Sequence, residues 1–80
     1  MEKRIGVIAI LVKEKAYIAK LNSILSDFAS IIRGRMGLPM KDKSVQVISL
    51  IVEGTTDELG ALTGKVGKLP GITVKSILTK

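Results

Sequence analysis

Residues 5–12 read Ile5-Gly6-Val7-Ile8-Ala9-Ile10-Leu11-Val12, a stretch without a single charged side chain. Aliphatic residues occupy both odd and even positions, whereas a strand with one solvated face alternates apolar and polar residues. The pattern therefore predicts a strand that is covered on both faces. Residues 44–53 (SVQVISLIVE) repeat the pattern over most of their length. We expect these two strands to form the centre of one sheet.

The segment between the two strands predicts a helix and a weaker strand. From about Lys15 to about Ala29, apolar residues recur every three or four positions, as is typical of a helix with one buried stripe: Tyr17, Leu21, Ile24, Leu25 and Phe28. Residues 31–36 then form a weak strand that glycine interrupts. Residues 37–39 (Gly-Leu-Pro) predict the turn that ends it.

A second helix and a last strand follow residue 54. Thr55 with Glu58 three residues later predicts a capping box at the helix start. Residues 69–71 (Leu-Pro-Gly) predict its end, because proline cannot continue a helix and glycine tolerates the exit geometry. Residues 72–78 read as a strand. Within the helix, Gly60 and Gly64 form a smooth patch that predicts close packing against a neighbouring element, with a ligand groove as the alternative.

The order strand, helix, strand, strand, helix, strand indicates an α+β fold of the ferredoxin-like βαββαβ type. We expect one domain over residues 1–80, with an antiparallel four-stranded sheet whose first and third strands are central and whose second and fourth strands are edges. Right-handed connections put both helices on one face of the sheet. The other face then exposes aliphatic side chains. We expect it to pack against another copy of the chain, in a dimer or tetramer with two-fold symmetry.

The composition argues against catalysis. The chain has no histidine, cysteine or tryptophan. Its serines therefore lack a histidine base, and its carboxylates form no recognisable acid–base pair. We expect no enzyme activity, no catalytic residue, no metal site and no cofactor.

The charge and the apolar runs bear on partners and location. A net charge of +6 suits nucleic acid, so the alternative reading is a basic nucleic-acid-binding transcriptional regulator. We do not expect nucleic acid as a partner, because the lysines are scattered and aromatic stacking residues are nearly absent. The apolar runs are far shorter than the roughly 20 residues of a transmembrane helix. We expect no membrane association and a cytoplasmic location.

The most suggestive chemistry lies in residues 31–39 (IIRGRMGLP). Arg33 and Arg35 are two residues apart and would point to the same side of a strand. Together they could hold a phosphate or carboxylate. Gly37 and Pro39 would shape a backbone that a ligand can approach. The alternative is structural: the arginines would protect an edge strand or pair with acids across an interface. Gly34, Gly37 and Pro39 would form a bulge and a turn.

Several segments carry a family resemblance: residues 34–39 (GRMGLP), 45–52, 53–65 (EGTTDELGALTGK) and 69–76 (LPGITVKS). Together they resemble the iron-only hydrogenase system regulator family. More distantly the chain is similar to ACT domains and to the metal-sensing domain of the nickel-responsive repressor. The resemblance implies an ACT-like ferredoxin fold that assembles into dimers or tetramers.

Two departures limit what can be transferred. The nickel repressor binds its metal through histidine and cysteine, which this chain lacks. ACT amino-acid sites commonly use a glycine-bearing turn after the first strand, where this chain has residues 12–16 (VKEKA). The identity of an effector is therefore left open.

From the fold and the family resemblance together, we expect a small oligomeric regulatory module linked to the iron-only hydrogenase system. It would bind a small anionic effector or a hydrogenase-system protein at a subunit interface, through Arg33, Arg35, Gly37 and Pro39.

Overall fold

The computed structural model describes residues 2–79 and places β1 (Arg4–Val12) and β3 (Val45–Gly54) at the centre of a four-stranded antiparallel sheet. Met1 and Lys80, the ends of the predicted domain, lie outside the described residues. β2 (Ile32–Met40) and β4 (Ile72–Leu78) are the edge strands, in the order β2-β3-β1-β4. The predicted ferredoxin-like βαββαβ fold is confirmed. The two apolar strands take the central positions, where each is hydrogen-bonded to a strand on both sides.

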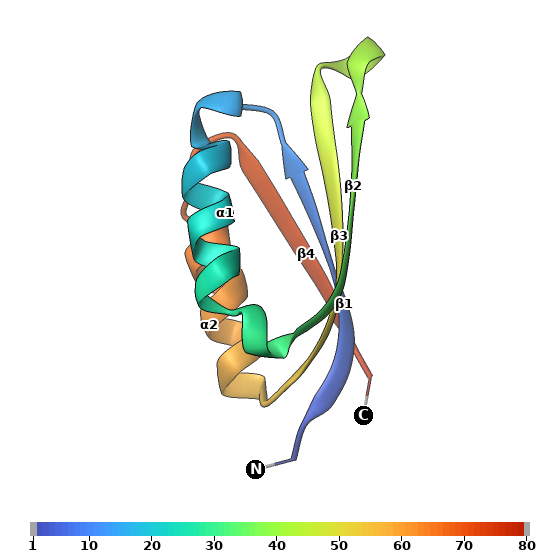
Figure 1. Ribbon diagram of the computed structural model, residues 1–80, viewed down its shortest axis with the longest axis vertical. Helices are drawn as coiled ribbons and strands as arrows, with labels where there is room; N and C mark the ends of the chain where they lie inside the picture. Colours follow the sequence, from blue (N-terminus) through green and yellow to red (C-terminus); the bar gives the residue numbers. More distant parts are fainter. Residues whose placement is uncertain (1, 80) are drawn as a thin grey trace.

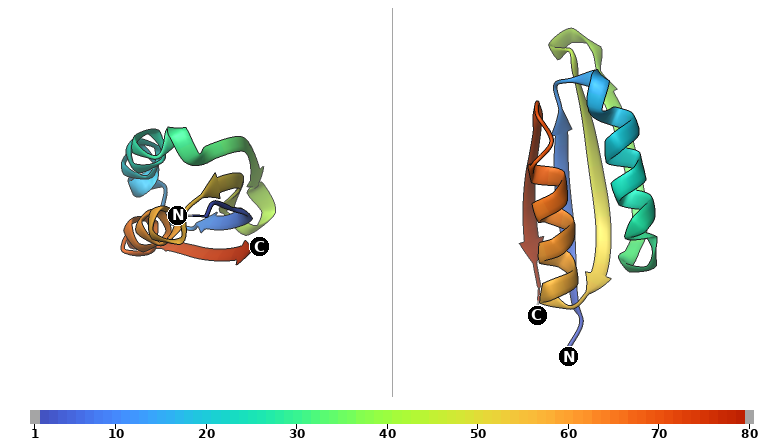
Figure 2. Two further views of the ribbon diagram at one scale, coloured as in Figure 1. Left: turned by 90° about the horizontal axis from the view of Figure 1, so that it is seen from below. Right: turned by 90° about the vertical axis from the view of Figure 1, so that its left-hand side faces the viewer.

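Two helices cover one face of this sheet (Figures 1 and 2). A short 3-10 turn at Lys15–Tyr17 leads into α1 (Ile18–Asp27), and α2 (Thr56–Gly67) connects β3 to β4. In the described residues no buried side chain is polar or charged. The core between helices and sheet is therefore aliphatic: Ile8, Ile10, Val12, Leu21, Leu25, Ile31, Ile48, Leu50, Val52, Leu59, Leu62, Val66, Leu69 and Ile72.

The predicted boundaries of α2 are confirmed. The hydroxyl of Thr55 accepts a hydrogen bond from the backbone N–H of Glu58 at 3.1 Å. The Glu58 carboxylate accepts one from the backbone N–H of Thr55 at 2.8 Å, which completes the capping box. After α2 the chain turns at Gly71, whose φ of 71° lies in the left-handed region. Gly71 also has no room for a side chain, because a Cβ there would clash with the Cβ of Glu14.

The second strand is longer than expected, and the turn predicted at residues 37–39 is wrong. β2 continues to Met40, with Gly37 opposite Ile48 and Pro39 opposite Gln46. Proline is tolerated because β2 is an edge strand, where a missing N–H need not serve a second neighbour. The chain reverses instead at Lys41–Lys43. The resulting β2–β3 hairpin projects past the start of α1 (Figure 1), and the long dimension of the molecule is 41 Å.

The face of the sheet away from the helices, called the open face below, is exposed and mostly apolar, with Ser49 and Lys75 among its polar residues. Directly opposed residues of antiparallel strands share a face, so Ile51, Val7 and Ile77 form one row across β3, β1 and β4. Their exposed fractions are 45%, 42% and 74%. β1 and β3 are thus covered on one face only in the single chain, although their sequences predicted cover on both.

Candidate functional site

A bulge in β2 separates the two arginines. Ile32 lies opposite Val52 and Gly34 opposite Ile51, so Arg33 is the extra residue without a direct partner. The Arg33 guanidinium (Nη1) donates to Oε1 of Glu53 at 3.2 Å. Arg35 points to the helix side of the sheet.

The prediction that the two arginines point to the same side is therefore wrong. One inserted residue shifts the alternation of a strand, and each later side chain changes face. The Arg33–Glu53 pair is well exposed, with 66% and 38% of the side chains accessible. Such surface pairs contribute about 0.2–1 kcal/mol. Arg33 thus secures the bulged edge to β3 on the open face.

Arg35 lies between β2 and α1. Its Nη2 donates to Oδ1 of Asn22 at 2.7 Å. The pair borders a cavity of about 260 Å³ whose lining mixes polar and apolar side chains: Asn22, Leu25, Ser26, Ala29, Ile32 and Arg35. Arg35 is the one cation in that lining. Because the guanidinium has five N–H donors and one is used by Asn22, it retains donors for an anion.

Gly37 and Pro39 lie on the same side of β2 as Arg35, because alternate residues of a strand share a face. The nearest atom to a Cβ on Gly37 would be Nε2 of Gln46 at 3.7 Å, which leaves open space beside the strand. Pro39 lines a second cavity, of about 320 Å³, at the hairpin end. We call the space between β2 and α1, with its two cavities, the β2–α1 groove. Arg35 and Pro39 each line one of the two cavities, and Gly37 faces the groove between them without lining either. Arg33 lies outside the groove.

The fold adds groove residues that sequence reasoning missed. Lys15 precedes α1 and Lys41 follows β2, yet both line the hairpin-end cavity together with Gln46. Asn22 and Ser26 are one helical turn apart on α1 and line the Arg35 cavity. No local pattern marks these side chains, since each reads as an ordinary surface residue in its own segment. Their proximity depends on the distance between β2 and α1.

The charged side chains that line the groove are cations, which suit the binding of an anion. Its linings hold an arginine and two lysines and no carboxylate. Within residues 2–79, no group of three or more histidine, cysteine, aspartate or glutamate side chains could hold a metal ion. Glu58 has a lowered pKa, because its carboxylate accepts hydrogen bonds from the backbone N–H and the hydroxyl of Thr55. It lies at the start of α2, outside the linings of both cavities. The part of the chain that the structure describes contains no helix long and apolar enough to cross a membrane.

Comparison with solved structures extends this fold assignment. The uncharacterized protein TM1266 from Thermotoga maritima superposes with a TM-score of 0.93 at 31% sequence identity, over 99% of this chain and 100% of that one. The ACT domain of the GTP pyrophosphokinase from Chlorobium tepidum gives 0.78 at 20% identity, over 94% and 99%. The C-terminal domain of the MgtC protein from Mycobacterium tuberculosis gives 0.73 at 15% identity, over 95% and 87%. The similarity to these last two proteins concerns the fold alone, and the similarity to the ACT domain confirms the predicted ACT-like fold.

The sequence also matches a family model over nearly its whole length. The TM1266-like family, described as "Iron-only hydrogenase system regulator, putative", matches residues 4–76. Among curated proteins, no sequence matches the chain. The family match and the 31% identity to TM1266 agree with the resemblance carried by residues 34–39 and 53–65. The chain therefore belongs to the TM1266-like, iron-only hydrogenase system regulator family.

Proposed function

We propose that the chain is a cytoplasmic, self-associating regulatory module of the iron-only hydrogenase system, with an effector site in the β2–α1 groove. The observation that carries the proposal is that the two faces of β2 present different side chains to different surfaces. Arg35, Gly37 and Pro39 follow the groove, while Met36 and Leu38 extend the open face. A regulator needs a sensing surface and an output surface, and this edge strand contributes to both.

Self-association is supported by the character of the open face. Met36 and Leu38 are 71% and 59% exposed, and they continue the apolar surface formed by Ile51, Val7 and Ile77. Contiguous exposed apolar surface on a small protein commonly marks an interface. A second copy related by two-fold symmetry would present the same apolar surface in return. Each copy would then bury the residues that the single chain leaves in contact with water.

Effector binding is supported by the position of Arg35. Its guanidinium borders a cavity and has donors beyond the one bonded to Asn22. An anionic effector beside Arg35 would lie on the opposite side of β2 from a second copy on the open face. We therefore assign Arg33 a supporting role at the open-face rim, through Glu53.

The self-association half is tested by size-exclusion chromatography with light scattering. We expect the wild-type mass to be at least twice that of one chain at low micromolar concentration. Ile51→Lys should give a monomer, because it places a charge in the centre of the buried face. Ala61→Lys adds the same charge on the exposed side of α2 and should leave the mass unchanged. A monomeric wild type would refute self-association.

The effector half is tested by thermal melting with a panel of anionic metabolites. A ligand that binds only the folded protein raises its Tm. We expect at least one compound to raise the Tm of wild type and of Arg33→Ala, whose guanidinium lies on the other side of β2. The same compound should have little effect on Arg35→Ala. Equal shifts in wild type and both variants would show that the ligand binds elsewhere.

A further inference from the structure

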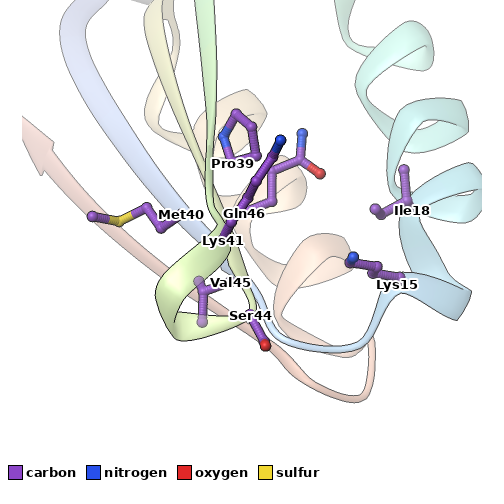
Figure 3. A pocket seen from close by; sticks show the side chains of 8 residues that line it. All are labelled: Lys15, Ile18, Pro39, Met40, Lys41, Ser44, Val45 and Gln46. Carbon is purple, nitrogen blue, oxygen red and sulfur yellow. The ribbon is translucent and has the colours of Figure 1, made fainter.

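The larger cavity of the β2–α1 groove lies at its hairpin end and has two facing walls (Figure 3). Lys15 and Ile18, at the start of α1, form one wall. Pro39, Lys41 and Gln46, from the hairpin, form the other; the Gln46 amide is directed toward α1, Lys41 lies beside Pro39, and Met40 points away. The cavity measures about 320 Å³, within the usual range for small-molecule sites.

Charge sets this cavity apart from the rest of the groove. Lys15 and Lys41 line it, and its lining contains no acidic residue. The nearby carboxylate of Glu14 is turned back to the backbone, where it accepts from the N–H of Ala16 at 3.4 Å. Within residues 2–79 the salt bridge found is that of Arg33, so neither lysine is in a salt bridge with a described carboxylate. Two ammonium groups beside one cavity attract an anion.

The remaining lining suits the body of an organic molecule. Ile18 and Pro39 give apolar surface, and the Gln46 amide extends into the space between the walls (Figure 3). Ser44 contributes a hydroxyl from a residue with a φ of 54°. A side chain is strained in this left-handed conformation, whereas glycine would adopt it freely. The turn therefore has a strained backbone at Ser44, and the serine hydroxyl remains at the cavity.

We propose that the hairpin-end cavity binds a small organic anion, whose phosphate or carboxylate group lies between the ammonium groups of Lys15 and Lys41. The apolar body of the ligand packs on Ile18 and Pro39. The Gln46 amide and the Ser44 hydroxyl orient its polar atoms. This inference rests on the groove being the effector site of the proposed function, and it gives the effector a chemical class and an orientation.

The test is an NMR titration of the full chain, with backbone amide shifts as the readout. Four probes separate the contributions: phenyl phosphate, 3-phenylpropionate, the neutral 3-phenylpropanol, and inorganic phosphate. We expect amides of residues 15–18 and 39–46 to shift with the two organic anions, at an affinity at least tenfold above that for the alcohol. The stronger of the two will identify the preferred anionic group. Inorganic phosphate should shift the same amides more weakly, because it lacks the apolar body.

Paired variants assign the effect to the two lysines. The double variant Lys15→Gln and Lys41→Gln should lose at least tenfold in affinity for the organic anions. Lys20→Gln with Lys68→Gln removes the same net charge at exposed positions outside the cavity and away from the open face, and should retain the wild-type affinity. Equal losses in both pairs would reduce the effect to overall charge and overturn the inference.

The same spectra distinguish failure of this inference from failure of the proposed function. Shifts confined to the lining of the Arg35 cavity would overturn the Lys15–Lys41 site while leaving an effector site in the groove. If no probe shifted any backbone amide, the proposed anion site at the hairpin-end cavity would also be overturned. Self-association is measured separately by light scattering and is unaffected by either result.

Discussion

Gly6 and Gly64 occupy opposite environments, and each shows how a single position limits what can stand there. A Cβ on Gly6 would lie 2.6 Å from Cδ2 of Leu78 and 2.8 Å from the backbone oxygen of Ile77. β1 and β4 can approach only because no side chain intervenes. A Cβ on Gly64, or on Gly60, would meet nothing within 4 Å. The close packing predicted for these two helix glycines is therefore absent within the chain.

Alanine at these two positions should change stability in opposite directions. Gly6→Ala must displace the backbone of β4, so we expect the free energy of unfolding to fall by about 1–3 kcal/mol. Gly64→Ala is the matched control, because it adds the same methyl group to open space. It should raise the free energy of unfolding by up to about 1 kcal/mol through helix propensity. Urea unfolding followed by circular dichroism measures both, and a neutral Gly6→Ala would contradict the close approach.

At the scale of elements, α2 shows how a local motif links helix stability to pH. Its first turn contains Asp57 and Glu58, which also suit the positive end of the helix dipole. The hydrogen bond from the backbone N–H of Thr55, followed by that from its hydroxyl, lowers the pKa of Glu58 from the usual 4.5. Since the folded-state pKa is below the unfolded one, the stabilisation is present above the unfolded pKa. It is lost as the pH falls through the folded pKa.

Glu58→Gln should flatten the acid limb of the stability profile. Between about pH 5 and pH 3 we expect the free energy of unfolding of wild type to fall more steeply than that of the variant. Glutamine retains a side-chain oxygen for the Thr55 N–H but does not titrate. Asp57→Asn changes an acid in the same turn that makes no capping-box bond, and serves as the control. Parallel profiles for wild type and Glu58→Gln would show that the carboxylate contributes no pH-dependent stability.

The molecule as a whole combines a dry aliphatic core with an apolar face that the single chain leaves exposed. An 80-residue chain buries only about two-thirds of the surface that its unfolded form exposes. It has no cysteine to supply a disulfide. Covering the open face with a second copy would add buried apolar area at about 25 cal/mol per Å² before the cost of association. Assembly and stability should therefore be linked.

This linkage predicts a concentration-dependent Tm. If the folded chain self-associates through the open face, raising the protein concentration should raise the Tm of wild type by mass action. Leu38→Lys places a charge on that face and should abolish the dependence, whereas Ala61→Lys on α2 should preserve it. Differential scanning calorimetry over a hundredfold concentration range measures the shift. A Tm independent of concentration in wild type would contradict self-association.

The sequence alone determined the central strands, both helices, the capping box and the strand order, because each depends on local periodicity or on short-range hydrogen bonds. It also indicated three of the residues that follow the groove. Only the tertiary structure decided the rest. A one-residue bulge turned Arg33 away from Arg35. The glycine at position 34 made a bulge one reading of this segment, but which residue is inserted depends on the pairing with β3. The presence of Lys15 and Lys41 at one cavity depends on how far α1 lies from the β2–β3 hairpin, which packing across the whole core sets.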